Sequence, residues 1–184
     1  MTAWLVRHGE TEWSAAGRHT SHTDLPLTAN GERQALAVRD AVHGVDFDAV
    51  LASPRLRARR TAELAGYPDP EVDPDLVEWD YGEYEGVTTA KIRESVPGWT
   101  VWTHPVPGGE SAAQLTERLD RVVERLRSYP GRVLVFGHGH ALRALAARWL
   151  GEPVALGRYL RLHTATVSVL SDDRGTPVID RWNA

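Results

Sequence analysis

The sequence predicts an α/β fold, a three-layer α/β/α sandwich with a mostly parallel central sheet. Three observations predict it. Short apolar runs that suit buried strands alternate with amphipathic helical segments over most of the chain. Two of those runs end alike, in a histidine followed by a glycine, at His8 and at His138. The length of 184 residues suits one compact unit, so residues 1–184 are expected to form a single domain.

The first half of the chain has a β-α-β-α order. Residues 3–6 form a short apolar run that suits a buried strand. Thr28 can cap a helix that continues to about His43, and a glycine follows to stop it. Residues 49–52 give a second strand, and the arginine-rich segment after it predicts a helix that continues through Leu64.

The second half adds a long helix and completes the sheet. Ser111 and Gln114 have the spacing of a capping box at the start of an amphipathic helix. Its inner face is expected to consist of Leu115, Leu119, Val122, Val123 and Leu126. Residues 132–136 predict a strand that leads to a helix over 141–150. Residues 160–181 predict two short strands around a turn, in a sheet with helices on both faces.

Composition limits the partners and the chemistry. The formal net charge of -4 gives no bulk attraction to nucleic acid or to an anionic membrane, so neither is expected as a partner and any anion site must be local. The absence of cysteine excludes disulfides, thiolate nucleophiles and cysteine-bound zinc, and it fits a reducing compartment. The apolar run at the N-terminus is too short for a signal peptide or a membrane span. We therefore expect a cytoplasmic protein, and self-association stays open.

Histidine and arginine side chains gather where the predicted strands end. In α/β sheets ligands bind beyond the carboxyl ends of the strands, so His8 and His138 can face one pocket. Arg7 precedes the first histidine, and Arg57 lies one turn into the helix after the second strand. Two guanidinium groups can hold a tetrahedral oxyanion through paired donors, which suits a phosphate group.

Covalent catalysis by a histidine needs a neutral ring whose attacking nitrogen carries no proton. Its other nitrogen must donate to an acceptor, for which a backbone carbonyl at Gly9 is suitable. A proton donor for the leaving oxygen is also needed. Glu78, which lies among aromatic residues, is the candidate, because such surroundings and a bound phosphate can raise the pKa of a carboxyl group.

With these residues identified, the chain resembles the histidine phosphatase superfamily, whose fold is phosphoglycerate-mutase-like. The motifs that carry the resemblance follow one another in the order of that family. They are Arg7-His8-Gly9-Glu10-Thr11, Ser53-Pro54-Arg55-Leu56-Arg57, Glu78-Trp79-Asp80-Tyr81-Gly82, Gly108-Gly109-Glu110-Ser111 and His138-Gly139 with Leu142-Arg143. They span nearly the whole chain.

The resemblance implies roles for individual residues. His8 becomes the phosphohistidine, Glu78 the proton donor, and Arg7, Arg57 and His138 bind the phosphoryl group. Three candidate substrate-binding residues match positions that touch substrate in the mutases, and three more lie within or beside the motifs. The six are Ser14, Thr20, Ser21, Tyr81, Gly139 and His140.

Other features are similar to the acid phosphatase and sedoheptulose-bisphosphatase branch of the family. Residues 17–20 and 99–104 are among those that carry this similarity. Two serines, Ser14 and Ser21, depart from the mutase pattern, which usually has asparagine and glycine there. The mutases also carry a long insertion after the acid loop, whereas only about twenty residues separate Gly86 from Gly108 here. A shorter lid favours transfer of the phosphoryl group to water.

The sequence therefore predicts a metal-independent phosphomonoesterase, without a cofactor, that acts on small phosphorylated metabolites such as sugar phosphates. Three alternatives remain. The first is a phosphoglycerate mutase. The second is a metal hydrolase that uses His138 and His140 as an H-x-H pair, although Arg7 and Arg57 would repel a cation. The third is an inactive module that only binds a phosphorylated ligand. Specificity is expected to depend on residues 18–24 and 97–109, where Trp99 and Trp102 are candidates to wall a cleft.

Overall fold

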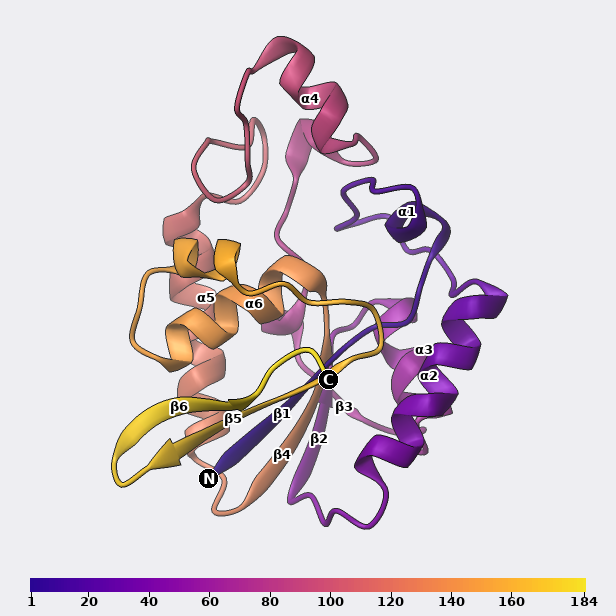
Figure 1. Ribbon diagram of the computed structural model, residues 1–184, viewed down its shortest axis with the longest axis vertical. Coiled ribbons are helices and arrows are strands. Elements are labelled where there is room, and N and C mark those ends of the chain that lie inside the picture. The colour runs from indigo at the N-terminus through magenta and orange to yellow at the C-terminus, as the bar shows by residue number, and fades with distance from the viewer.

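A six-stranded sheet occupies the centre of the computed structural model, which describes residues 1–184 (Figure 1). The strands lie in the order β3-β2-β4-β1-β5-β6. Their bounds are β1 Thr2–Arg7, β2 Ala49–Ala52, β3 Glu71–Val72, β4 Arg132–Gly137, β5 Val167–Asp173 and β6 Thr176–Arg181. The first four strands of that order pair in parallel, while β5 pairs antiparallel with both β1 and β6. The prediction of a mostly parallel sheet is confirmed.

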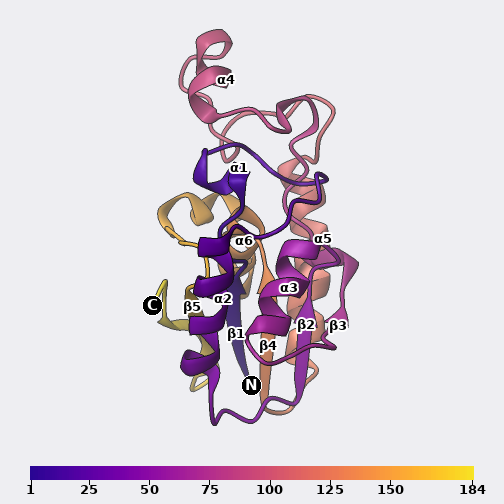
Figure 2. The same cartoon turned by 90° about the vertical axis from the view of Figure 1, so that its right-hand side faces the viewer.

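Helices cover both faces of this sheet. Figures 1 and 2 show α2 and α3 on one side and α5 and α6 on the other, while α4 projects beyond the carboxyl ends of the strands. The α-helices are α1 Glu12–Ala15, α2 Ala29–Val42, α3 Leu56–Leu64, α4 Thr89–Ser95, α5 Ala112–Arg127 and α6 Gly139–Trp149. The 3-10 helices are η1 Pro74–Leu76, η2 Gly82–Tyr84 and η3 Val154–Tyr159. The predicted three-layer α/β/α arrangement is thus confirmed.

Side-chain caps start the two longest helices where the sequence predicts them. The hydroxyl of Thr28 accepts a hydrogen bond from the backbone N–H of Gly31 at 3.0 Å. At α5, the hydroxyl of Ser111 accepts from the N–H of Gln114, and the side chain of Gln114 accepts from the N–H of Ser111. Each cap satisfies N–H groups that have no partner within the helix, so the chain enters each helix at a defined residue.

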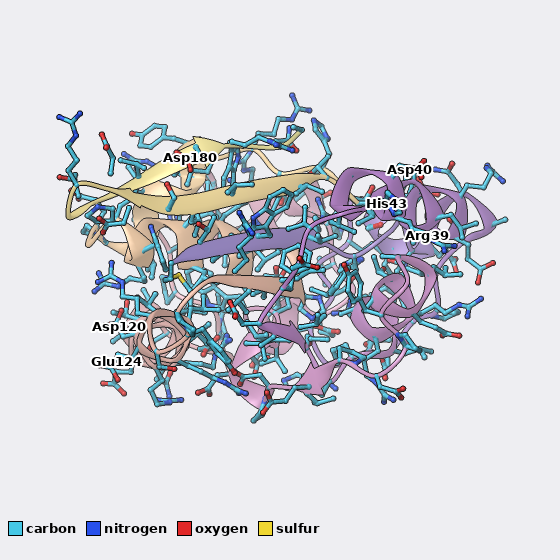
Figure 3. The ribbon with its side chains drawn as sticks, turned by 90° about the horizontal axis from the view of Figure 1, so that it is seen from below. Arg39, Asp40, His43, Asp120, Glu124 and Asp180 are labelled. Carbon is cyan, nitrogen blue, oxygen red and sulfur yellow. The ribbon has the colours of Figure 1, made fainter.

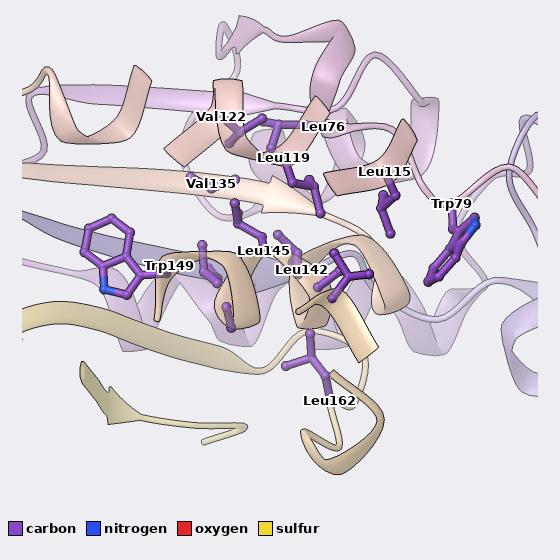
Figure 4. Close-up of a cluster of buried hydrophobic side chains, with 14 of the residues drawn as sticks. Leu76, Trp79, Leu115, Leu119, Val122, Val135, Leu142, Leu145, Trp149 and Leu162 are labelled. Carbon is purple, nitrogen blue, oxygen red and sulfur yellow. The ribbon is translucent and has the colours of Figure 1, made fainter. Parts of the chain in front are cut away.

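The period of two along the strands divides the core between the two faces. In β4, Val133 and Val135 belong to the cluster under α5 and α6, whereas Leu134 and Phe136 belong to the cluster under α2 and α3. Figure 4 shows the first cluster, where leucines of α5 and α6 gather beside Val135 of β4. All five residues predicted for the inner face of α5 are buried there. Alternation of this kind is expected for a strand that is covered on both faces.

The structure differs from the prediction at a few short elements. Helix α6 begins at Gly139, two residues earlier than predicted, because His138 adopts the extended backbone of an N-cap. The strand β3 has only two residues, and α4 has seven. Neither was predicted, since elements this short carry little periodicity and depend on contacts with the rest of the fold.

Charged side chains occupy the outer surfaces of the layers. Figure 3 shows Asp120 and Glu124 on the outer face of α5, and Arg39 and Asp40 on the outer face of α2. None of the helices combines the length and the apolar composition that crossing a membrane requires.

Candidate active site

Strand register brings the two motif histidines together. In the pairing of β1 with β4, Arg7 lies opposite Gly137, and the N–H of His8 donates to the carbonyl of Gly137 at 3.0 Å. The next residue on each strand is therefore a histidine at the same edge of the sheet. The ring centroids of His8 and His138 are 5.2 Å apart. The prediction that both rings reach one place is confirmed.

The ring of His8 is held in one tautomer. Its Nδ1 lies 2.7 Å from the carbonyl oxygen of Gly9. Because a carbonyl only accepts, Nδ1 must carry the proton and Nε2 is left with a free lone pair. Burial, followed by the charges of Arg57 and Arg7, lowers the pKa of His8 well below its usual value. The ring is therefore neutral at neutral pH, as a histidine nucleophile requires.

His138 has protein partners on both ring nitrogens. The Nε of Arg57 donates to its Nδ1 at 3.2 Å, and its Nε2 lies 2.7 Å from the hydroxyl of Ser53 at the end of β2. Since arginine has no acceptor, the proton of His138 must be on Nε2 and is directed to Ser53. Burial is the main reason why the pKa of His138 is well below its usual value, and the charge of Arg57 adds to it.

The guanidinium group of Arg57 is fully buried behind the histidines. It donates to the backbone carbonyls of Thr20, Ser21 and Thr23 as well as to His138. Glu85 holds that loop in turn, because its carboxylate accepts from the N–H groups of Ser21 and Thr23 and from the hydroxyl of Ser21. Burial alone would raise the pKa of Glu85, but these hydrogen bonds outweigh it and lower the pKa.

Arg7 keeps a donor free at the site. Its Nη1 donates to the carbonyl of Leu162 at 2.7 Å, while its Nε is buried without a protein partner. Gly139 leaves room for this side chain, since a Cβ atom there would lie 3.3 Å from both Nε and Cζ of Arg7. Arg7 itself lines the cavity, so its guanidinium group is suited to a ligand oxygen there.

Glu78 lies at the start of helix α6. One oxygen accepts from the N–H groups of Ala141 and Trp79 at 2.7 and 2.9 Å, and the other accepts from the N–H of His140 at 3.0 Å. The first N–H groups of a helix have no partner within it, so a carboxylate fits there well. The side chain is buried, and one of its two oxygens accepts from a single N–H group.

A cavity of about 240 Å³ opens beside these groups. Eight of the predicted site residues line it: Arg7, His8, Ser14, Thr20, Glu78, Tyr81, Gly139 and His140. Three predicted residues, Arg57, His138 and Ser21, are not part of its lining. Arg57 and His138 form a layer behind His8, and the hydroxyl of Ser21 is turned to Glu85. The expectation that Ser21 lies at the cavity surface thus differs from the structure, because Glu85 offers it a charged acceptor at 2.6 Å.

Further residues line the cavity that the sequence analysis did not name as individual site residues, although Arg18 and His19 belong to the segment 18–24 in which it expected specificity. They are Gly17, Arg18, His19, Thr89, Arg143 and Leu162. Arg143 had a usable signal, since it follows His140 by three residues and so shares a helix face with it. Thr89 and Leu162 had none, because each reaches the cavity only through the packing of a distant loop. His19 is buried, and its ring lies 4.6 Å from that of Tyr81.

Comparison with known proteins is consistent with this geometry. The family model described as the histidine phosphatase superfamily, branch 1, matches residues 3–184. The chain belongs to the histidine phosphatase superfamily. As a histidine phosphatase it is an enzyme of the phosphoric monoester hydrolase class, and its fold matches the phosphoglycerate-mutase-like fold.

Several relatives of this histidine phosphatase align with most of its length. It is 45% identical over 175 residues to an acid phosphatase of Mycobacterium tuberculosis, an alignment that covers 93% of this chain and 86% of the relative. It is 38% identical over 180 residues to the sedoheptulose 1,7-bisphosphatase of Saccharomyces cerevisiae, covering 80% and 66%. A probable phosphoglycerate mutase of Salmonella choleraesuis is 33% identical over 193 residues, covering 99% and 90%.

A solved structure supports the same relationship. The product of an open reading frame of Mycobacterium tuberculosis superposes on this histidine phosphatase with a TM-score of 0.95 at 41% sequence identity. The superposition covers 99% of this chain and 96% of the other. Acid phosphatase and bisphosphatase relatives accordingly precede the mutase in similarity to this chain, as the predicted branch implies.

Proposed function

We propose that this histidine phosphatase hydrolyses small phosphorylated metabolites, sugar phosphates above all, through a phosphohistidine on His8 and without a metal ion. One observation carries the proposal: His8 lines the cavity as a neutral ring whose Nδ1 is held by the Gly9 carbonyl, which leaves Nε2 as the nucleophile. A phosphoryl group that enters the cavity meets this nitrogen, the guanidinium group of Arg7 and the carboxyl group of Glu78 together.

In the first step, Nε2 of His8 attacks phosphorus and the bond from phosphorus to the ester oxygen breaks. Protonated Glu78 gives its proton to that oxygen, which leaves as an alcohol. Oε2 of Glu78 accepts one N–H whereas Oε1 accepts two, so Oε2 is proposed to carry this proton. The ring of His8 is now phosphorylated on Nε2. Its Nδ1 still carries a proton and donates it in a hydrogen bond to the carbonyl of Gly9.

In the second step, water attacks the phosphorus of phosphohistidine. Glu78, now a carboxylate, accepts a proton from that water, and the bond from phosphorus to nitrogen breaks. Inorganic phosphate leaves, and His8 returns to its neutral form with Glu78 protonated again. Atoms, charges and protons therefore balance over the cycle.

Arginine charge is proposed to stabilise the phosphoryl oxygens in both steps, since phosphoryl transfer is catalysed largely by positioning and electrostatics. Arg7, which lines the cavity, is suited to contact an oxygen directly through its guanidinium group. Arg57 and His138 are proposed to act on the phosphoryl group from the layer behind His8, Arg57 through its charge, since the hydrogen-bonding groups of both residues are directed to protein partners. The positive charge of Arg57 beside His138 would repel a cation, which disfavours the alternative of a metal hydrolase with an H-x-H pair.

The lining of the cavity supports a polar substrate. Twelve of its fourteen residues are not hydrophobic, and Arg18 and Arg143 add positive charge beyond the groups at His8. Relatives named as an acid phosphatase and as a sedoheptulose bisphosphatase support the same substrate class. The proposal further takes residues 1–184 as one catalytic domain, acting in the cytoplasm on a small metabolite, with neither nucleic acid nor membrane as partner.

The test is to trap the intermediate. Brief incubation with a phosphate donor and a rapid alkaline quench is expected to yield a phosphoryl adduct that is stable to base, labile to acid and located at His8. His8→Ala is the control that must lack it. A label on serine or aspartate, or no label in the wild type under conditions of turnover, contradicts the proposed mechanism.

Independence from metals is tested separately. Activity is expected to survive dialysis against EDTA, because arginine charge supplies what a cation otherwise would. Loss of activity on chelation with recovery on addition of zinc supports the metal hydrolase instead.

A further inference from the structure

Trp102 lies behind the cavity wall and does not line the cavity itself. It belongs to the segment 97–109. Its ring packs edge to face on Trp79 with centroids 5.5 Å apart, and on His140 with centroids 5.2 Å apart. The guanidinium carbon of Arg143 lies over the same ring at 4.8 Å from its centroid. One indole thus contacts two residues, His140 and Arg143, that do line the cavity.

Arg143 is fixed from two sides. Its Nε donates to the carbonyl of Gly157 at 2.9 Å, and its Nη2 donates to the carbonyl of Arg158 at 3.2 Å. Trp102 covers the face of the guanidinium group. Nη1 has no protein acceptor, so the side chain reaches the cavity with its direction set and one nitrogen available to a ligand.

His140 is fixed by a different pair of contacts. Its Nδ1 lies 2.5 Å from the hydroxyl of Tyr81, and Trp102 packs against its ring. Its backbone N–H is occupied by Glu78, so neither the ring nor the main chain of His140 is loose. The ring presents its remaining nitrogen as a second polar group of the cavity.

Gly157 completes the arrangement from η3. A Cβ atom there would lie 2.7 Å from the edge of the Trp102 ring and 3.1 Å from the carbonyl carbon of Arg143. Only a residue without a side chain allows Trp102 to lie this close to Arg143. On its other side, Trp102 borders a separate hollow between residues 101–106 and the start of α5, into which a displaced ring can move.

We propose that Trp102 is a positioning residue for substrate specificity. It fixes Arg143 as a donor, and His140 as a second polar group, for anionic or hydroxyl oxygens on the part of the substrate beyond the transferred phosphoryl group. This inference rests on the proposed function, since it assigns the outer part of that same cavity. The reacting groups do not touch Trp102, so its removal should change substrate binding far more than the chemical step.

The kinetic test compares two substrates in Trp102→Leu. For a sugar bisphosphate, KM is expected to rise about tenfold, as for the loss of one hydrogen bond to a charged group, with kcat nearly unchanged. For phenyl phosphate, whose ring carries no further oxygen, KM and kcat should both stay within about twofold of the wild type. Equal losses for the two substrates, or a fall in kcat alone, overturn the inference.

Trp4→Leu is the matched control. Trp4 is also partly buried, packs edge to face on Phe47 at 5.7 Å and has Arg181 at 5.4 Å from its centroid, yet it does not line or border the cavity. The variant Trp4→Leu measures how far the loss of a partly buried tryptophan changes KM and kcat through protein stability alone. A selective rise in KM of the same size in Trp4→Leu also contradicts the inference.

Gly157→Ala provides a test from another element. Its methyl group is expected to push Trp102 toward the hollow and so to reproduce the selective rise in KM while all the site residues remain intact. Trp102→Phe, which keeps an aromatic ring, is expected to lie between Trp102→Leu and the wild type. Wild-type kinetics in Gly157→Ala, with Trp102 shown by NMR to have moved, are evidence against the inference.

A readout without turnover separates this inference from the proposed function. NMR titration of His140 in the wild type is expected to show a pKa well below the usual value, because burial and then the charge of Arg143 lower it. Tyr81 and Glu78 also contact this residue. In Trp102→Leu the pKa of His140 should rise, because the ring loses part of its cover, while that of His138 stays unchanged. An unchanged pKa of His140 overturns the inference, whether or not the enzyme turns over either substrate. A wild-type enzyme that turns over neither substrate would instead refute the proposed function.

Discussion

Histidines in this site are neutral, and the charge around them belongs to arginine. Burial lowers the pKa of His8, His138 and His140 well below the usual value, and nearby guanidinium groups lower each further. Such rings act as nucleophile, acceptor or neutral donor, and they leave Glu78 as the acidic partner within the cavity. Proton transfer in the proposed cycle therefore depends on one carboxyl group.

The first prediction at this scale concerns Glu78. Glu78→Gln is expected to slow hydrolysis of an alkyl phosphate by roughly 10² to 10⁴, the usual contribution of general acid catalysis. An aryl phosphate should be affected much less, because a phenolate leaves without a proton. Steady-state rates for a sugar phosphate and for p-nitrophenyl phosphate measure both effects. Equal losses for both substrates would show that Glu78 mainly positions the site or acts only on water.

His19 predicts a dependence of stability on pH. Burial lowers its pKa to about 4, although the charge of Glu85 opposes this effect. Above about pH 6.5 the ring is neutral in both the folded and the unfolded chain. Between pH 6.5 and 4 the unfolded chain binds a proton that the folded protein does not, so stability falls as the pH falls through this window.

Urea denaturation at pH 7.5 and pH 4.5 tests this expectation by comparing the wild type with His19→Gln. The free energy of unfolding of the wild type should fall more than that of the variant, by an amount on the order of 2 kcal/mol. Other titrating groups are shared by the two proteins and cancel in the difference. A parallel fall in both proteins would mean that His19 is protonated in the folded state at pH 4.5.

At the scale of elements, α5 secures the segment that carries Glu78. Arg118 on α5 donates two hydrogen bonds to the carboxylate of Glu110 and further ones to the backbone carbonyls of Asp75 and Val77. Its side chain and that of Glu110 are nearly buried. The last of these acceptors, Val77, immediately precedes Glu78, so the helix determines where the proposed acid can lie.

Two arginines of α5 provide a matched pair of variants. Arg118→Met is expected to lower the free energy of unfolding by about 3 kcal/mol, because it leaves Glu110 nearly buried without a partner. Arg121→Met also removes an ion pair with two hydrogen bonds, in this case to Asp75. Because the Arg121 side chain is 59% exposed, the loss of this pair should lower the free energy of unfolding by less than about 1 kcal/mol. Denaturation at neutral pH measures both. Similar costs for the two variants would refute the role given to the buried pair.

At the scale of the whole molecule, the site lies at one end of the sheet, and a small set of loops covers it. Figure 1 shows α4 and the adjoining loops beyond the carboxyl ends of the strands. The entire path from Gly86 to Gly108, α4 included, has only about twenty residues. A cover this small is suited to admit water to a phosphohistidine.

The last prediction follows from that architecture. With 3-phosphoglycerate as a probe, release of inorganic phosphate is expected to exceed isomerisation to 2-phosphoglycerate, and addition of 2,3-bisphosphoglycerate should not reverse the order. Phosphate release and isomer formation can be followed in the same reaction mixture. Efficient isomerisation that depends on the bisphosphate would identify the enzyme as a mutase.

Local signals in the sequence determined much of the scaffold. The bounds of β2, the caps at Thr28 and Ser111 and the inner face of α5 follow from patterns within a few consecutive residues, and the structure confirms them. The parallel sheet also placed His8 and His138 at one edge, because strands that run in the same direction end at the same edge. Short-range sterics and hydrogen bonding suffice for features of this kind.

Only the tertiary structure decided how the site is completed. Ser53, His138 and His8 become neighbours because β4 lies between β2 and β1, an order that no local pattern specifies. Arg57 was expected in the cavity, yet it points to His138 and to loop carbonyls, since these fill its donors where water cannot. The contacts of Trp102 likewise join three distant segments. Packing between remote parts of the chain depends on all of them at once, and that information is absent from any single stretch of sequence.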